Sequence, residues 1–435
     1  MNEMPRIVLN NEANIEFQTP DDASYFFGYY DKSPMDMSGS RLLAHRVTFD
    51  GRNVLKTDEA TCGYFNLRNQ QYVEIGETQC FNWQQGSMMQ WLPTDYSSKI
   101  IYNKIVNGKY GSIIYDTTDN SEKNISCPIY SVHPSGDFAI GVNYYHLYFC
   151  RPGYNYLGIE NKEWDQYIPD EDGLYYINLN TGECNLLIAT RAIAGISHKP
   201  AMDLVYNWLE HCMWNWSGSK FAFLHRFSDP YNWAKHRLFI ADCNGDNIKY
   251  LRSFDYISHY NWIDDNLLIA WSKPASQVFN IYSRGVLNNS FWLRPLRFGY
   301  RLWKKKTKNR KLLQTISGNA GFYSIDTCGE HYNIIGKGIL DQDGHPSFMR
   351  NGRIMLGDTY ANSEGYRELY LFNTVSSKKV TIGKFYSGSF VNDYRCDLHP
   401  RWDHSFTRVI IDTAATGNRR KMVVINVESL LKALY

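Results

Sequence analysis

One short pattern returns seven times along the chain, and this repetition constrains the fold more than any other feature. Each copy has an aromatic or apolar residue, a short polar turn and then an apolar run, as in "WNWSGSKFAFLHRF" (214–227). A second strand-like run follows each copy and ends in a polar turn, as in "LYYINLNTGE" (174–183), while helical periodicity is nearly absent. The other copies are "MDMSGSRLLAHRV" (35–47), "WLPTDYSSKIIYNKI" (91–105), "VHPSGDFAIGVNY" (132–144), "NWIDDNLLIAWS" (261–272), "FMRNGRIMLGDTY" (348–360) and "RWDHSFTRVIIDTA" (401–414).

Seven pairs of hairpin signals at intervals of roughly 40–60 residues predict an all-β fold, a seven-bladed β-propeller with about four strands in each blade. We expect a single propeller to span residues 1–435. Two stacked β-sandwiches are the alternative, but seven like units fit a ring better.

Composition and cysteine usage limit the functional classes. Hydrophobic residues are 43% and charged residues 21%, as in an ordinary soluble globular protein, and the net charge of +2 is too small to indicate a polyanion partner such as nucleic acid for the whole molecule. The nine cysteines are scattered and include no C-x-x-C pair, which predicts reduced thiols in a cytoplasmic protein. The chain shows no secretion signal and no apolar run of about 18 residues.

Two segments interrupt the repeat. Residues 145–173 are aromatic and polar, and we expect them to form a loop over one face. Residues 285–318 hold nine Lys and Arg and no acid, interleaved with Phe, Trp and Leu. This composition suits a segment that lies on an anionic membrane surface, with a solvated loop as the alternative. Nucleic acid is a weaker option, because no accompanying motif is present.

Histidine recurs at one position of the repeat. His211, His345 and His399 stand seven residues before the turn residue of their copies, and His259 stands six residues before it. Lys32 takes the same position in the first copy. Equivalent positions of every blade lie at equal distances from the axis of a propeller. We therefore expect these five side chains to meet at one mouth of the central channel.

Strand alternation adds neighbours to this group. In "YRCDLHPRWDHSF" (394–406) the side-chain period of an extended chain places Arg395, Asp397, His399 and Arg401 on one face. The motifs "GYYDKSP", "NWQQGS" and "GDTY" are expected to contribute Asp31, Gln84, Gln85 and Asp358.

Imidazoles and a carboxylate that converge are ligands for a first-row divalent metal such as Mn, Fe or Zn. We predict a metal site at His259, Asp397 and His399, and an acid or base in His211 or Lys32. Polar side chains that only bond backbone and water are the alternative. The residues predicted to bind the substrate are Arg395, Arg401, His345, Gln85 and Asp31, because arginines hold carboxylates and phosphates well.

Four stretches resemble the oligogalacturonate lyases, seven-bladed propellers that cleave pectin-derived uronide oligomers by β-elimination with a bound manganese. They are "EHCMWNWSGSKFAFLH" (210–225), "SHYNW" (258–262), "GHPSF" (344–348) and "DLHPRW" (397–402). The resemblance implies manganese at His259, Asp397 and His399, and a position near the substrate for His211. The chain departs from the family at two other places. Tyr394 stands where a glutamine ligand is expected, and no arginine stands near Gly173, where the base is expected.

These features predict a cytoplasmic, carbohydrate-active propeller that acts on an acidic glycan or sugar nucleotide by lyase-type elimination with a divalent metal, manganese being expected. The motifs "GYYDKSP", "NWQQGS" and "LHPRW" further resemble bacterial propellers associated with surface-polysaccharide gene clusters. One alternative is a non-catalytic binding or assembly module of polysaccharide biosynthesis, docked on the inner membrane through residues 285–318. A second is a glycosyl-transfer component, for which the sequence offers no nucleotide-binding glycine fingerprint.

Overall fold

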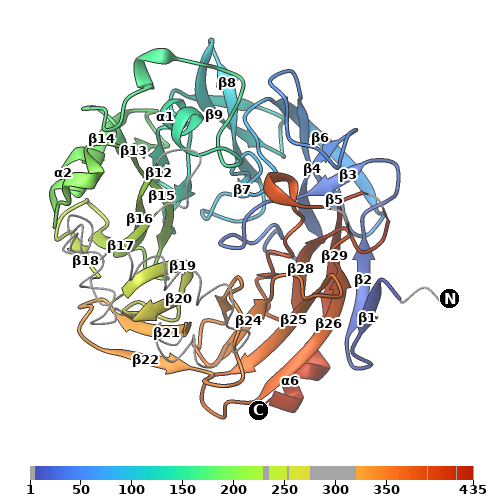
Figure 1. Ribbon diagram of the computed structural model, residues 1–435. Coiled ribbons are helices and arrows are strands. Elements are labelled where there is room, and N and C mark those ends of the chain that lie inside the picture. The colour runs from blue at the N-terminus through green and yellow to red at the C-terminus, as the bar shows by residue number, and fades with distance from the viewer. Residues whose placement is uncertain are drawn as a thin grey trace.

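The fold is a ring of seven antiparallel sheets in a computed structural model that describes residues 5–228, 235–251, 254–274, 320–388, 390–417 and 419–434. Figure 1 looks down this ring, with β7, β15, β19, β24 and β28 near its centre. The predicted all-β, seven-bladed propeller is thus confirmed, and each copy of the repeat supplies the turn between the first two strands of a blade and its second strand. The continuous apolar runs are the reason, because each blade buries both of its faces against neighbouring blades.

The first three blades follow the order of the chain. Blade 1 contains β3 (Ser24–Phe26), β4 (Arg41–Val47), β5 (Ala60–Asn66) and β6 (Gln71–Thr78). Blade 2 contains β7 (Gln90–Trp91), β8 (Lys99–Val106), β9 (Lys109–Asp116) and β10 (Glu122–Ile125). Blade 3 contains β11 (Ser131–Val132), β12 (Phe138–Val142), β13 (Gly173–Asn178) and β14 (Cys184–Ala189).

The last four blades follow the same order. Blade 4 contains β15 (Tyr206–Trp214), β16 (Lys220–Ser228), β17 (Lys235–Asp242) and β18 (Lys249–Tyr250). Blade 5 contains β19 (Phe254–Trp262), β20 (Leu267–Pro274), β21 (Gly321–Asp326) and β22 (Tyr332–Ile335). Blade 6 contains β23 (Ser347–Phe348), β24 (Ile354–Asp358), β25 (Tyr366–Asn373) and β26 (Lys379–Tyr386). Blade 7 contains β27 (Arg401–Trp402), β28 (Arg408–Thr413) and β29 (Lys421–Asn426).

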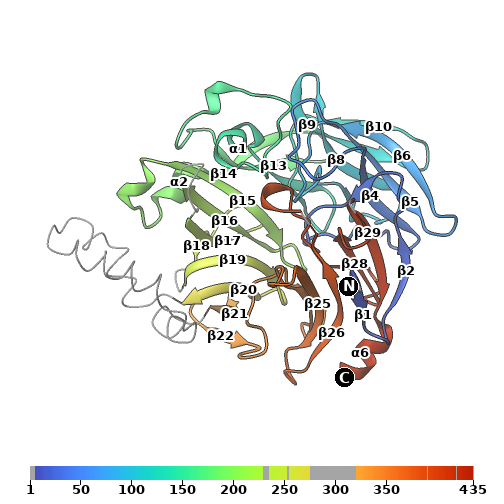
Figure 2. The same ribbon diagram turned by 45° about the vertical axis from the view of Figure 1, so that its right-hand side comes forward.

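The N-terminal strands close the ring. Strand β2 (Asn14–Gln18) is the outer strand of blade 7, with Ile15 opposite Ile425 of β29. Strand β1 (Ile7–Leu9) adds a fifth strand to blade 6. Both views place β1 and β2 beside the C-terminal strands and helix α6 (Glu428–Leu434), as Figure 2 shows. Blade 7 therefore requires both ends of the chain.

Aromatic residues that open the copies lock neighbouring blades together. The indole N–H groups of Trp91, Trp214 and Trp262 each donate to a carbonyl of the preceding blade, at distances of 3.0–3.3 Å. The rings themselves are buried. The recurring tryptophan therefore has a structural role, because it satisfies its polar atom while its ring fills the space between two sheets.

Short helices occur outside the blades. Helix α1 (Tyr144–Cys150) begins one residue before the expected loop 145–173, and the turn η1 (Lys162–Trp164) lies within it. Besides α6, the described residues also form α2 (Thr190–Gly195), η2 (Pro200–Met202) and η4 (Asn392–Tyr394). Among the residues described, no helix is long and apolar enough to cross a membrane. The basic segment 285–318 lies outside the described residues, so its binding to a membrane stays a prediction.

The cysteines differ from expectation. Cys127, between blades 2 and 3, forms a disulfide with Cys184 at the start of β14. The prediction of reduced thiols throughout is therefore wrong for this pair. The two cysteines are separated by 57 residues, and only the return of the outer strand of blade 3 brings them together. No local sequence motif predicts a disulfide between two cysteines so far apart in the chain.

Replacing both cysteines by serine is expected to lower the free energy of unfolding by about 2–4 kcal/mol, because the link restricts the unfolded chain. Urea unfolding of the oxidised protein measures the effect, and Cys328→Ser, at an exposed free thiol, is the matched control. An unfolding midpoint of the double variant equal to that of the control would contradict a structural disulfide.

Candidate functional site

A backbone irregularity just before the inner strand explains how histidines reach the channel. On β15, Glu210 pairs with Leu224 and Met213 with Ala222, so one extra residue bulges from the strand at His211. Strand β19 has the same shift around His259. His211 and His399 also have positive φ values, 56° and 41°. Such a bulge re-aims a side chain, and non-glycine residues with positive φ are uncommon and often mark functional positions.

Four histidine rings meet at this level of the channel, and we call His211, His259, His345 and His399 the histidine cluster. The centroid of the His345 ring lies 4.3 Å from that of His259 and 4.5 Å from that of His399. His211 joins through Tyr29, whose ring stacks on it at 5.0 Å and contacts His399 edge-on at 5.2 Å. Four blades thus contribute to one buried group.

The segment that carries Tyr29 enters the channel from blade 1. Its backbone is held by Arg401, whose Nε donates to the Tyr29 carbonyl at 2.8 Å and whose guanidinium pairs with Asp412. Gly28, at φ 133°, lies so close to Gln85 that a Cβ would stand 2.5 Å from the Gln85 carbonyl carbon. Only glycine allows this approach, which fixes Tyr29 at the centre of the cluster.

Two histidines of the cluster are hydrogen-bonded to a carboxylate through Nδ1. His345 Nδ1 lies 2.9 Å from Asp358, and His259 Nδ1 lies 3.0 Å from Asp343. Each of these contacts requires a proton on Nδ1 and leaves a lone pair on Nε2. A carboxylate partner of this kind orients metal-binding histidines and raises their basicity, and it also orients a general base.

Asp397 and His399 complete a set of donors with His345. One ligand atom from each of these three residues lies within 4.8 Å of the other two, and all three are buried. The Nε2 atom of His399 is buried and has no hydrogen-bond partner among the described residues. Two imidazoles and a carboxylate form a donor set that suits a first-row divalent ion.

Two arginines share the Asp397 carboxylate. Arg367 Nη1 lies 2.8 Å from one oxygen and Arg395 Nε lies 2.7 Å from the other. Burial alone would raise the pKa of Asp397, but these two positive charges hold it far below its usual range. The carboxylate is therefore ionised at neutral pH. A carboxylate has about four lone-pair sites. The Asp397 oxygens can therefore bind a metal ion while they keep both ion pairs.

His211 has its own network. Gln85 Nε2 donates to the Tyr130 hydroxyl at 2.6 Å, and that hydroxyl lies 3.0 Å from His211 Nδ1. The hydroxyl proton is thus directed at Nδ1, which places the imidazole proton on Nε2, 3.8 Å from Glu210. Glu210 is itself buried between Arg226 and Arg151, at 2.7 and 3.2 Å.

Burial controls the charge of the cluster. It lowers the pKa of His211, His259 and His399, for His211 and His399 well below the usual range, so these three imidazoles are neutral at pH 7. Burial raises the pKa of Tyr29, which stays a neutral phenol. The site therefore combines uncharged imidazoles with arginine–carboxylate pairs.

The structure separates the residues grouped by sequence. His211, His259, His345, His399, Asp397, Arg395 and Gln85 lie at the histidine cluster, and Gln84 and Asp358 support it through hydrogen bonds. Lys32 and Asp31 instead pair with each other and line a cavity to which the four histidines do not contribute. The Lys32 ammonium lies 5.6 Å from the Tyr130 ring, and the Tyr130 hydroxyl connects it to His211. Arg401 is 1% exposed and anchors the Tyr29 segment rather than facing the cluster.

Several residues of the site escaped the sequence reasoning. Arg367 lies within β25. Glu210 directly precedes His211 in the sequence, and Asp343 stands two residues before His345. Tyr154, from the loop between β12 and β13, accepts a hydrogen bond from Arg395 at 3.0 Å and contacts the His211 ring. Glu210 stands next to His211 in "EHCMW", which is a local signal, whereas Asp343 in "DGHPSF" bonds His259 rather than His345.

Comparison with known proteins supports the fold. No family model and no curated protein matches the sequence. Among solved structures, an oligogalacturonate lyase in complex with manganese matches with a TM-score of 0.60 and 14% identity, over 95% of this chain and 92% of that one. An oligogalacturonate lyase from Vibrio parahaemolyticus matches with a TM-score of 0.60 and 13% identity, over 97% and 96%. The predicted distant resemblance is therefore confirmed at the level of the fold.

Proposed function

We propose that the chain binds an acidic glycan at the histidine cluster and cleaves it by β-elimination with the help of a divalent metal. The observation that carries the proposal is the buried convergence of four histidines on the donor set of His345, Asp397 and His399, with His259 and His345 each oriented by a carboxylate. The fold shared with a lyase that binds manganese supports the same chemistry.

The metal assignment differs from the sequence expectation in one residue. The donors are His345, Asp397 and His399, with the neighbouring His259 kept for proton transfer. The unpartnered Nε2 of His399 and the carboxylate-backed His345 fit an N,N,O set for Mn²⁺ or a similar ion. When bound, such an ion withdraws electrons from a uronate carboxylate and acidifies the adjacent C–H group.

The protein groups then have distinct roles. Arg395, whose side chain is 24% exposed, lies at the opening and holds the substrate carboxylate. His259 Nε2 takes the proton from the carbon next to that carboxylate, and Asp343 stabilises the imidazolium that forms. A C=C bond forms as the glycosidic C–O bond breaks. His211 Nε2 donates a hydrogen bond to the departing oxygen, which takes its proton from solvent.

The test is to incubate the full chain with a panel of uronide oligomers and added Mn²⁺ and to follow the absorbance of the unsaturated product. His259→Asn is expected to reduce kcat by about 10²–10⁴-fold, as for the loss of a general base. His331→Asn, at an exposed histidine, should leave kcat unchanged. Absence of product from every uronide with the wild-type protein would contradict catalysis.

A binding role without turnover is the second candidate. It is favoured by the depth of the cluster, because Tyr29, His345 and His399 are 7%, 2% and 2% exposed. Saturable binding of an acidic oligosaccharide to the wild-type protein, with no unsaturated product, would support this role over the lyase. Recruitment to a membrane and a cytoplasmic location are further proposals, which rest on composition alone.

A further inference from the structure

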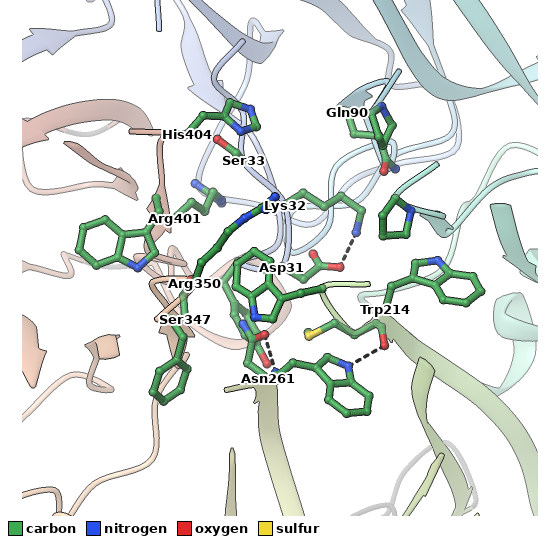
Figure 3. Close-up of a pocket in the computed structure, with 18 of the residues that line it drawn as sticks. Asp31, Lys32, Ser33, Gln90, Trp214, Asn261, Ser347, Arg350, Arg401 and His404 are labelled. Carbon is green, nitrogen blue, oxygen red and sulfur yellow. Dashed lines mark hydrogen bonds and ion pairs between the residues drawn. The ribbon is translucent and has the colours of Figure 1, made fainter. Parts of the chain in front are cut away.

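A second cavity lies on the other side of Tyr30 from the histidine cluster. It has a volume of about 490 Å³ and is formed where the inner strands turn back at the far end of the channel. Neither the four clustered histidines nor Asp397 line it. Figure 3 shows Lys32 and Asp31 meeting in it, with Gln90, Trp214, Asn261, Arg350 and Arg401 around them. A cavity of this size falls within the range of small-molecule sites.

Two buried polar atoms of the lining lack partners. The side chain of Asp31 is 3% exposed, and its Oδ1 accepts no hydrogen bond from the described residues. Trp402 is 5% exposed, and its indole N–H likewise has no acceptor within the described part of the chain. The equivalent N–H groups of Trp91, Trp214 and Trp262 all donate to a carbonyl. Leaving such groups unpaired is costly, so a ligand that donates to Asp31 and accepts from Trp402 would gain from both contacts.

The charged side chains deep in the cavity are paired with one another or with neighbouring carboxylates. The Lys32 ammonium pairs with the Asp31 carboxylate, and Arg401 pairs with Asp412. Arg350 has no carboxylate partner among the described residues, but it is exposed and stacks over Trp216 at 5.4 Å. A free anion in the deep part would therefore lie beside the Asp31 carboxylate without an uncommitted cation to neutralise it.

Aromatic surface supplies the rest of the lining. Trp214, Trp262 and Trp402 contribute to the walls, and Trp216 is 37% exposed. The required ligand has apolar C–H faces for these rings and closely spaced groups that both donate and accept. Sugar hydroxyls meet the second requirement, because each is one donor and two acceptors, and the C–H faces of a pyranose ring meet the first.

We propose that this cavity binds a short neutral saccharide, at a site separate from the histidine cluster. The proposal goes beyond the lyase function and does not depend on it, since none of the four clustered histidines lines this cavity. In this arrangement Asp31 accepts from one sugar hydroxyl, Trp402 donates to another, and Trp216 covers a ring at the opening.

Titration of the full chain with neutral di- and trisaccharides, followed by tryptophan fluorescence and calorimetry, tests the proposal. We expect saturable binding of at least one saccharide. Trp402→Phe keeps the ring and removes the N–H, and should weaken binding about tenfold, the equivalent of one hydrogen bond. Trp216→Ala changes an exposed side chain, so it tests the site even if Trp402→Phe fails to fold. Trp164→Phe, outside the cavity, is the matched control.

His399→Ala separates this site from the histidine cluster, because saccharide binding should survive a change that removes a proposed metal ligand. The proposal is overturned if no neutral saccharide binds, if only acidic saccharides bind, or if Trp402→Phe and Trp216→Ala bind as the wild type does. Loss of binding in His399→Ala with full binding in Trp216→Ala would place the sugar at the cluster instead, and would equally overturn it.

Discussion

Replacement of Asp397 by asparagine is expected to lower the free energy of unfolding by about 3–5 kcal/mol at neutral pH. This is the usual cost of removing one partner of a buried ion pair, because the other charge stays buried without compensation. Asp397 is 2% exposed, and its two oxygens lie 2.8 and 2.7 Å from Arg367 and Arg395. Asparagine keeps the shape and removes the charge, which leaves the largely buried Arg367 without its counter-ion. Urea unfolding of the purified variant measures the loss.

The pH dependence separates lost charge from disturbed packing. The pKa of Asp397 in the folded state is far below the value of about 3.9 in the unfolded chain. Its stabilisation is therefore complete above about pH 4 and is lost as the pH falls below that value. The difference between wild type and Asp397→Asn should be largest at pH 7 and narrow below about pH 4. Glu77→Gln, at an exposed carboxylate of β6, should match the wild type throughout. A constant difference at all pH values would show that packing is responsible.

The fold was predictable because the sequence of each blade contains a pattern that by itself predicts one β-hairpin. An aromatic residue, a polar turn and an apolar run identify one hairpin, and seven such units leave few architectures other than a ring. The closing strands β1 and β2 carry no such signal. They were missed because their partners, β26 and β29, lie almost at the other end of the chain. Pairing at such distances depends on the closed ring itself.

The position of Lys32 shows where counting along a repeat fails. Counting back from the turn gives a position along the chain but not the path that the chain takes before the inner strand. In blade 1, β3 ends at Phe26 and pairing with β4 resumes only at Met35, which bridges Leu42. The residues between them leave the sheet and cross the channel. Lys32 therefore lies beyond Tyr30 from the histidines, although its sequence position matches theirs.

Arg367, Arg151 and Glu210 could not be predicted from the sequence for another reason. Arg367 reaches Asp397 from the neighbouring blade, and Arg151 reaches Glu210 from the loop before β13. No spacing rule connects such pairs, because each depends on the angle between blades and on the path of a loop. The histidines were found because the repeat itself places them, and their partners were missed because the repeat does not.

Removal of either His345 or His399 is expected to abolish binding of a divalent metal, whereas His259→Ala should retain most of it. The first two residues belong to the buried donor set with Asp397, whereas His259 lies outside that set. Loss of a residue that only orients a ligand already weakens metal binding about 10–100-fold. Loss of a ligand should therefore weaken it by about 100-fold or more.

Elemental analysis after equilibration with Mn²⁺ and removal of free ion measures bound metal without any assay of activity. We expect about one ion per wild-type chain and almost none in His345→Ala or His399→Ala. His331→Asn controls for exposed histidine, and thermal unfolding confirms that each variant is folded. Metal retained in His345→Ala but lost in His259→Ala would restore the donor set inferred from sequence. A wild-type protein without bound metal would indicate that Arg367 and Arg395 already satisfy the Asp397 carboxylate, and that the cluster recognises its ligand through hydrogen bonds alone.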